Sequence, residues 1–289
     1  MKNKIVYPDY ENSILGISNS ILKYCGVEPL HKTSGVLDEY LKKDYKNVVV
    51  MLFDGMGMDC IENNFSEEDS FFRDNIKTEL SSVYLCTTTA ATTSLVTAQS
   101  PIEHGWLGWS CYFEEIGKLV NIFINDDGTI ADGVPVAKYN VADKYMNYKS
   151  IFEIINEQGN GIKADNVSRY GTVLIEDLDE LFAETKKLCE DSQKRFIYTY
   201  WNQPDGKMHV CGCYHKKVRC VLKEIQDKTK ELAKSCEDTL IIVTADHRLL
   251  DCGVKVIGRY PEIEKYLRCP TGLEPRCNSY YIKEGMIDK

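Results

Sequence analysis

Acidic and histidine side chains follow three apolar runs of this sequence, and their types suit the binding of a divalent metal. Asp54 comes directly after VVVMLF, and Asp205 comes shortly after FIYTYW with His209 four residues later. Asp246 and His247 directly follow TLIIVTA. Carboxylate oxygens and imidazole nitrogens are ligands for zinc, manganese or iron. Carboxylates gathered in a partly dry crevice would repel one another, and a bound metal pair removes that repulsion.

Each of these groups also has a simpler interpretation. Asp-Gly after a strand is often only a turn, so Asp54 alone indicates little. The spacing from Asp205 to His209 is common by accident, and both could lie on an exposed loop. Asp246 could cap a helix. Their occurrence in this order at the ends of successive apolar runs favours one shared metal site.

A threonine-rich segment supplies a hydroxyl nucleophile. The stretch CTTTAATTSLVTAQSPIEHGWLGW spans Cys86 to Trp109. At a helix N-terminus, free backbone N–H groups and the helix dipole would favour an alkoxide and an incoming phosphate. A threonine hydroxyl is a poor nucleophile until a metal lowers its pKa. The alternative is a buried Thr/Ala-rich helix whose hydroxyls cap its own N-terminus.

Hydrophobic periodicity predicts the elements that would position these residues. Short β-rich runs predict strands at Lys46–Phe53, Lys77–Tyr84, Ile162–Val167, Arg195–Trp201, Thr239–Thr244 and Asn278–Lys283, and apolar residues at helical spacing predict helices at Tyr148–Gln158, Asp177–Ser192 and Tyr214–Ser235. Buried strands that alternate with amphipathic helices are typical of an α/β fold with a largely parallel sheet. Such sheets bind ligands beyond the carboxyl ends of their strands, where the acidic residues lie.

Taken together and in order, the motifs resemble those of a known family. They are DGMG from Asp54, TTTAATTSLVT followed by PIEHG, PDGKMH from Pro204, and TADH ending at His247. This set resembles the alkaline phosphatase superfamily, in its type I phosphodiesterase/nucleotide pyrophosphatase branch, from about Tyr7 to the last residue. The resemblance implies a three-layer α/β/α sandwich with a largely parallel central sheet. It also implies one catalytic domain over residues 1–289, an excursion over the site at about 106–143, and a truncated C-terminus.

The resemblance further implies roles for individual residues. The nucleophile of the family lies six residues before the serine that is Ser94 here, which makes it Thr88, or Thr87 or Thr89 if the register slips by one. One metal ion would be held by Asp54, Thr88, Asp246 and His247, and the other by Asp205, His209 and one more histidine. The cofactors would be two divalent ions, zinc or alternatively manganese.

The implied activity is metal-dependent hydrolysis of phosphate esters, with a phosphodiester or pyrophosphate favoured over a monoester. The substrate would be a small phosphate ester. Two alternatives stay open at this point. One is a phosphomutase or phosphonate hydrolase on the same scaffold. The other is an inactive fragment or metal-binding relic that lacks the third histidine of the second metal site.

Three departures from the family pattern bear on these expectations. No histidine follows His247, and His215 could substitute only if it is not exposed in the following helix. Trp109 stands where the nucleotide pyrophosphatases place an asparagine that contacts a phosphate oxygen, so it lines a substrate pocket or packs in the core. Arg248 replaces a glycine and could bind a phosphate oxygen or form a salt bridge on the rim.

Composition narrows the possible partners and the compartment. The 289 residues have a formal net charge of −9, which argues against a nucleic-acid polymer as partner. The N-terminus has no apolar run, and the longest apolar stretch, Val48 to Phe53, is too short to span a bilayer. Twelve scattered cysteines without a C-x-x-C pair are expected to be reduced thiols. We therefore expect a cytoplasmic protein that does not bind a membrane.

Overall fold

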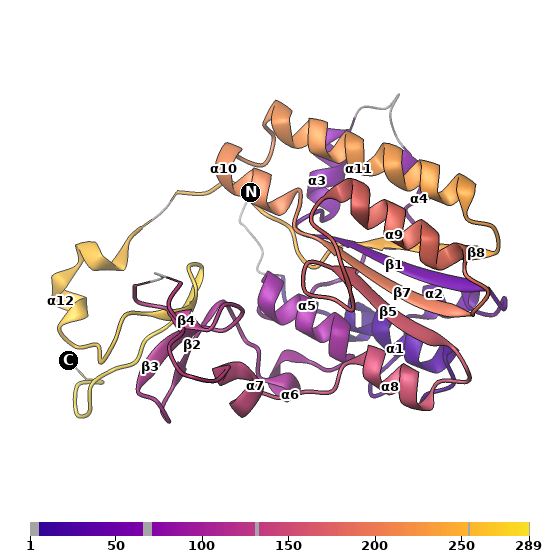
Figure 1. The fold of residues 1–289 in the computed structure, drawn as a ribbon. Coiled ribbons are helices and arrows are strands. Elements are labelled where there is room, and N and C mark those ends of the chain that lie inside the picture. Colours follow the sequence, from indigo (N-terminus) through magenta and orange to yellow (C-terminus); the bar gives the residue numbers. More distant parts are fainter. Residues whose placement is uncertain (1–5, 66–70, 131–132, 254, 289) are drawn as a thin grey trace.

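A parallel five-stranded sheet forms the centre of the molecule (Figure 1). The computed structural model describes residues 6–65, 71–130, 133–253 and 255–288. The strands are β1 (Asn47–Phe53), β5 (Lys163–Ser168), β6 (Val173–Leu174), β7 (Arg195–Trp201) and β8 (Thr239–Thr244). Their order is β6-β5-β7-β1-β8, and every pair is parallel. All seven residues of β1 are buried, which explains why its sequence is almost continuously apolar.

Helices cover both faces of this sheet (Figure 1). One face packs against α1 (Leu15–Tyr24), α2 (Gly35–Tyr40), α5 (Thr88–Thr97) and α8 (Ile151–Gln158). The other packs against α3 (Met58–Asn64), α4 (Phe71–Asn75), α9 (Leu178–Glu190) and α11 (Lys216–Ser235). Alternate residues of β1 enter the two cores, Val48 and Val50 on one side and Val49 and Met51 on the other. The predicted three-layer α/β/α sandwich with a parallel central sheet is confirmed.

Capping residues set where the predicted helices begin. Ser150 and Glu153 form a capping box, so α8 starts at Ile151 rather than at the predicted Tyr148. The Asp177 side chain accepts a hydrogen bond from the Glu180 backbone and starts α9 one residue later. The remaining short helices are η1 (Tyr10–Asn12), α6 (Pro101–His104), α7 (Val141–Tyr145), α10 (Asp205–Cys211), η2 (Ile257–Arg259) and α12 (Pro261–Glu264).

A second, antiparallel sheet lies beside the sandwich (Figure 1). It contains β2 (Ser110–Phe113), β3 (Lys118–Asn121), β4 (Asp126–Asp127), β9 (Gly272–Glu274) and β10 (Cys277–Ser279), in the order β10-β9-β2-β3-β4. The excursion that the sequence predicts at about 106–143 therefore supplies three strands of this sheet, and residues near the C-terminus supply two. The strand predicted at Asn278–Lys283 is shorter than expected, because Ile282 forms only an isolated bridge with Leu267.

The strand predicted at Lys77–Tyr84 is wrong. This segment joins no sheet, and only Ser81 forms an isolated bridge, with Ser13. Its backbone bonds go to the residues before α1, because Ile14 N–H donates to Ser81 O and Ser81 N–H donates to Asn12 O. The segment connects α4 to the start of α5 and packs beside the residues before α1 without joining a sheet of the described chain.

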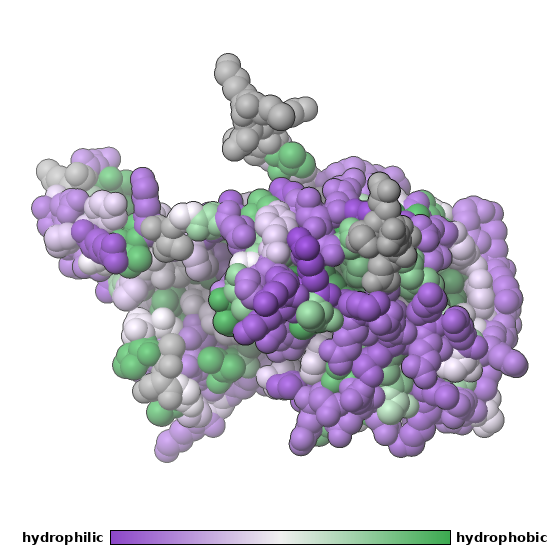
Figure 2. All heavy atoms as spheres, turned by 90° about the horizontal axis from the view of Figure 1, so that it is seen from above, coloured by the Kyte–Doolittle hydropathy of each residue, from purple (hydrophilic) through white to green (hydrophobic). Residues whose placement is uncertain are grey.

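Polar side chains dominate the face of the molecule formed by α9 and α11. Figure 2 shows this face as mainly hydrophilic, with apolar residues scattered among the polar ones. The described part of the chain contains no helix that is both long and apolar enough to cross a bilayer.

Candidate active site at the carboxyl ends of the strands

Parallel pairing brings the residues that follow β1, β7 and β8 to one edge of the sheet. Leu52 of β1 is in register with Tyr200 of β7 and with Thr244 of β8, so the chain leaves all three strands at the same level. Asp54 lies one residue beyond β1 and is buried. The Asp205 backbone N–H donates to the Asp54 carbonyl over 3.0 Å, which joins the two loops directly.

Gly55 allows these loops to approach each other. Its φ of +72° lies in the left-handed region, which residues other than glycine rarely adopt. A Cβ atom there would lie 2.9 Å from the Asp205 Cβ and 2.9 Å from the Met208 Cε, closer than van der Waals contact permits. The Asp-Gly pair is thus more than a turn signal, because the glycine lets the Asp205 loop pack beside Asp54.

The first residue of α5, Thr88, directs its hydroxyl into the same group. Thr88 Oγ1 lies 3.0 Å from His247 Nε2 and 3.3 Å from Asp54 Oδ1. The two neighbouring threonines that the sequence left open have different surroundings. The Thr87 hydroxyl donates to Glu274, and Thr89 is fully buried. Of the three, Thr88 is therefore the one whose hydroxyl faces the acidic residues.

Asp246 is held by the backbone around the site. Its Oδ1 accepts hydrogen bonds from Gly55 N–H at 3.0 Å and from His247 N–H at 2.9 Å. Its Oδ2 is buried and has no hydrogen-bond partner among the residues that the structure describes, and the same is true of Asp205 Oδ1. No helix begins at Asp246, so the alternative of a helix cap does not apply. Two orphaned carboxylate oxygens in one site are acceptors that a cation would satisfy.

The electrostatics of the site also suit a cation. Burial, followed by repulsion from Asp246, raises the pKa of Asp54 well above its ordinary value. Ligand atoms of Asp54, Asp205 and His247 lie within 4.8 Å of one another. This donor set of carboxylate oxygens and an imidazole nitrogen matches zinc and manganese. The residues present therefore fit a divalent metal.

The second group, Asp205 and His209, is more open. Both belong to α10, where their i, i+4 spacing places His209 Nε2 3.4 Å from Asp205 Oδ2. The His209 side chain is 64% exposed. His215 is exposed at the start of α11, and its ring accepts a hydrogen bond from the Lys217 backbone. It is thus the exposed residue that the sequence indicated.

Two side chains that support the site were missed by sequence reasoning. The Tyr200 hydroxyl donates to Asp54 Oδ2 over 2.6 Å, and the Ser82 hydroxyl donates to the Asp246 carbonyl over 2.6 Å. Burial and the adjacent Asp54 carboxylate raise the pKa of Tyr200, so the phenol keeps the proton that it donates. Tyr200 could have been found from its position next to the end of β7, whereas no local signal marks Ser82.

The two tryptophans of the segment GWLGW have different roles. Trp106 is 6% exposed and donates its indole N–H to the Met146 carbonyl, so it is a core residue. Trp109 is 42% exposed and contacts Phe123 edge to face. Its backbone N–H donates to Glu274. Arg248 is exposed, and its backbone forms an isolated bridge with Met56, the residue two positions after Asp54.

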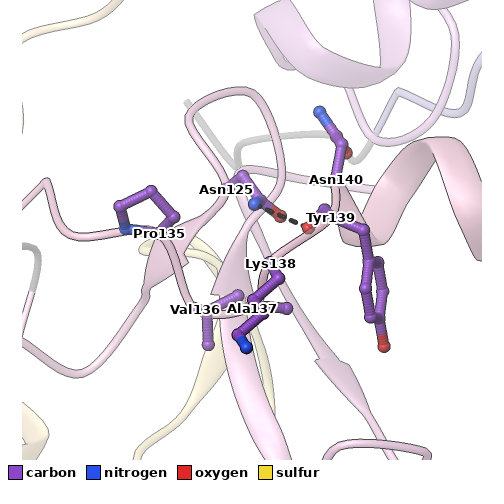
Figure 3. Close-up of a pocket in the computed structure, with 7 residues that line it drawn as sticks. All are labelled: Asn125, Pro135, Val136, Ala137, Lys138, Tyr139 and Asn140. Carbon is purple, nitrogen blue, oxygen red and sulfur yellow. Dashed lines mark hydrogen bonds between the residues drawn. The ribbon is translucent and has the colours of Figure 1, made fainter.

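A shallow hollow of about 680 Å³ opens on the loop that follows β4 (Figure 3). The Asn125 side chain shapes it by donating to the Tyr139 carbonyl and accepting from the Val141 backbone. Its seven lining residues include none of the acidic or histidine residues described above. This hollow is therefore separate from the group of acidic and histidine residues at the strand ends.

Burial of Asp246 predicts how the stability of the metal-free protein depends on pH. Burial raises the pKa of Asp246 to about 6. The folded state then holds this proton more tightly than the unfolded state. The stabilisation is complete below about pH 4 and is lost as the pH rises through 6. Replacing Asp246 by asparagine removes this dependence, together with the part of the Asp54 pKa shift that comes from repulsion by Asp246, while keeping the Oδ1 acceptor.

Urea unfolding in chelator checks this expectation. The free energy of unfolding of the wild type, relative to Asp246→Asn, should fall by about 2 kcal/mol between pH 4 and pH 7. Burial lowers the pKa of His104 to about 4, which acts in the opposite direction. Because both proteins contain His104, its effect cancels in the difference. A difference that stays constant over this range would contradict the prediction.

Comparison with known proteins is consistent with this geometry. A sequence model of the type I phosphodiesterase/nucleotide pyrophosphatase family matches residues 48–269. No curated protein sequence matches the chain. Among solved structures, murine ectonucleotide pyrophosphatase/phosphodiesterase 5, an inactive threonine-to-alanine variant in complex with AMP, is similar with a TM-score of 0.60 and 16% identity, over 85% of this chain and 68% of that one. The human protein of the same name gives 0.61 and 16%, over 83% and 67%. This similarity shows a shared, alkaline phosphatase-like fold.

Proposed function

Since the chain belongs to the type I phosphodiesterase/nucleotide pyrophosphatase family and is a phosphoric ester hydrolase, we propose that it cleaves phosphodiester or pyrophosphate bonds of small molecules. Thr88 is the proposed nucleophile, and two divalent ions, zinc or manganese, are the proposed cofactors. The observation that carries the proposal is the position of the Thr88 hydroxyl, 3.0 Å from His247 Nε2 and 3.3 Å from Asp54 Oδ1.

The position of Thr88 at the start of a helix supports its proposed attack on phosphorus. It is the first residue of α5, a ten-residue helix whose free N-terminal N–H groups favour an anionic phosphate. The acceptors around its hydroxyl favour loss of the proton. Attack would break the bond from phosphorus to one alcohol or phosphate, which leaves with a proton, and would leave Thr88 esterified to the phosphate that still carries the other ester group. Water would then cleave this covalent phosphodiester, restoring the threonine hydroxyl and releasing a phosphomonoester. Tyr200 holds Asp54 in position through its 2.6 Å hydrogen bond.

The proposed metal ligands fall into two groups. Asp54, Thr88, Asp246 and His247 would hold one ion, and Asp205 and His209 would contribute to the other. Bound there, divalent ions would supply Lewis-acid stabilisation of the charge that develops on the attacking and leaving oxygens, and would lower the pKa of the nucleophile. The orphaned oxygens of Asp205 and Asp246 support this assignment.

The murine relative supports the nucleophile and the substrate class. Its inactive form carries an alanine in place of a threonine and binds AMP, a nucleoside monophosphate. A threonine is therefore essential in that protein, and a nucleotide fits its site. By analogy, a small ester of a nucleotide type is a candidate substrate here.

The net charge of the chain bears on the proposed substrate, and its free thiols bear on the proposed compartment. A net charge of −9 disfavours polymeric nucleic acid as substrate. All twelve cysteines are free, which is typical of a reducing compartment, and we propose the cytoplasm.

Hydrolysis of a chromogenic diester tests the proposal. Purified protein supplemented with zinc or manganese should release nitrophenol from bis(4-nitrophenyl) phosphate, at a rate above that of 4-nitrophenyl phosphate. Thymidine 5′-monophosphate 4-nitrophenyl ester tests the nucleotide type. If neither diester is cleaved with either metal while the protein remains folded, the proposed function is wrong and the interpretation as an inactive relative is favoured.

A further inference from the structure

A carboxylate from the small antiparallel sheet lies beside the nucleophile helix. Glu274, the last residue of β9, accepts hydrogen bonds at Oε1 from the Thr87 hydroxyl at 2.7 Å and from the Trp109 backbone N–H at 2.7 Å. Thr87 is the residue directly before Thr88. Glu274 therefore links the small sheet to the N-terminus of α5.

Close backbone packing fixes the position of this carboxylate. Leu273 pairs with Ser110 of β2 and has a φ of +67°, a conformation held only by its surroundings. A Cβ atom on Gly108 would lie 3.1 Å from the Leu273 backbone. The chain at 272–274 is thus pressed against the segment that carries Trp109. Glu274 is half-buried, and the described residues form no salt bridge with it.

Glu274 lies close enough to Thr88 for its negative charge to act on a phosphate bound there. Glu274 is hydrogen-bonded to the hydroxyl of Thr87, and the Cα atoms of the adjacent Thr87 and Thr88 are ~3.8 Å apart. The Glu274 carboxylate therefore lies within roughly 11 Å of the Thr88 hydroxyl. This is close to the Debye length of ~10 Å at 0.1 M ionic strength, and a partly buried charge is screened less than an exposed one. A phosphate attacked by Thr88 therefore experiences the negative charge of Glu274.

Phosphate esters differ in the charge that they bring to this place. A phosphodiester carries one negative charge. A phosphomonoester has a second pKa of about 6 and is mostly a dianion above neutral pH. Repulsion by a fixed carboxylate is therefore about twice as large for the monoester dianion as for the diester. A site at Thr88 without a nearby carboxylate would not distinguish monoester dianions from diesters by this repulsion.

We propose that Glu274 is a specificity-determining residue that disfavours phosphomonoester dianions and so selects singly charged diesters. This inference rests on the proposed function, because it concerns the substrate of the same site. The role is electrostatic. The two hydrogen bonds of Glu274 position its charge, while the charge itself discriminates between substrates.

Glu274→Gln tests the inference, because glutamine keeps the acceptor for Thr87 and Trp109 and removes only the charge. The ratio of kcat/KM for 4-nitrophenyl phosphate to that for bis(4-nitrophenyl) phosphate should rise about three- to tenfold at pH 8 and low salt. The increase should shrink in 1 M NaCl. Glu114→Gln is the matched control. It removes the same charge at the far end of β2, where Glu114 pairs with Arg268, and should leave the ratio unchanged.

A binding measurement separates this inference from the proposed function. Calorimetry with the metal-loaded protein would compare inorganic phosphate with dimethyl phosphate. Glu274→Gln should increase the affinity for phosphate relative to dimethyl phosphate by a similar factor. This shift in a protein that cleaves no ester would support the inference and refute the proposed function. An unchanged binding ratio in Glu274→Gln would overturn the inference, whether or not the protein is active.

A purely structural role for Glu274 has a different signature. Glu274→Ala removes the hydrogen bonds as well as the charge. If Glu274 only anchors the small sheet, the alanine variant should lower kcat/KM for both esters by the same factor, and the glutamine variant should resemble the wild type. That result would also overturn the electrostatic role.

Discussion

Replacing Thr88 by alanine should lower phosphodiester hydrolysis by about a thousandfold or more, because no other hydroxyl is aligned with Asp54 and His247 among the three threonines that begin the segment. The effect should fall on kcat, since the variant keeps the groups that bind phosphate. Steady-state kinetics with bis(4-nitrophenyl) phosphate measures it. Circular dichroism and thermal unfolding should show that the fold is retained.

Neighbouring variants make this result specific. Thr88→Ser keeps a hydroxyl and should retain measurable activity. Thr87→Ala loses only the contact with Glu274 and should stay within about tenfold of the wild type. Thr89→Ser keeps the buried position polar and should have little effect. If Thr87→Ala were inactive while Thr88→Ala kept its activity, the register would be shifted by one and Thr87 would be the nucleophile.

Removal of divalent metal should abolish hydrolysis, and restoring zinc or manganese should recover it. The buried Asp54 and Asp246 cannot hold a phosphate anion without a compensating cation, because their charges repel it. Elemental analysis of protein purified without chelator should find about two ions per chain. We expect one to be released more easily, because His209 is largely exposed and its group has fewer ligands.

Variants can assign the two ions. Asp246→Asn should remove the more tightly held ion, and His209→Ala should remove the weaker one. Lys207→Ala is a control on the same helix as His209 and should keep both. One ion or none in the wild type would mean that the Asp205 and His209 group does not assemble. Activity that persists in excess chelator would refute the metal mechanism.

The sequence predicted the sandwich and the meeting of the acidic residues for a clear physical reason. β1 contains a continuous apolar run and is buried on both faces, while β7 and β8 are rich in β-branched and aromatic residues that favour strands. Parallel strands end at one edge, so Asp54, Asp205 and Asp246 had to approach one another once the strands were identified. Their roles as metal ligands stay a prediction.

The small sheet could not be predicted in the same way. β9 has three residues and β4 has two, too few to show an alternating pattern. Their pairing with β2 and β3 is a tertiary arrangement that local sequence does not encode. Glu274 was missed for this reason, because its position near Thr87 depends on a pairing between residues 110 and 273. The segment Lys77–Tyr84 shows the converse, an extended stretch predicted as a strand that pairs with no strand of either sheet among the described residues.

The position of β1 in the sheet has a consequence for synthesis of the chain. Asn47–Phe53 pairs with Arg195–Trp201 on one side and Thr239–Thr244 on the other. Ribosomes add about 5–20 residues per second, so this apolar segment waits roughly 10–30 s for its first neighbour. Contacts so distant in sequence also slow folding after release. During that interval the nascent chain exposes the apolar segment Asn47–Phe53, which can associate with other exposed apolar segments. Efficient production of the enzyme should therefore depend on chaperones that bind such segments at the ribosome.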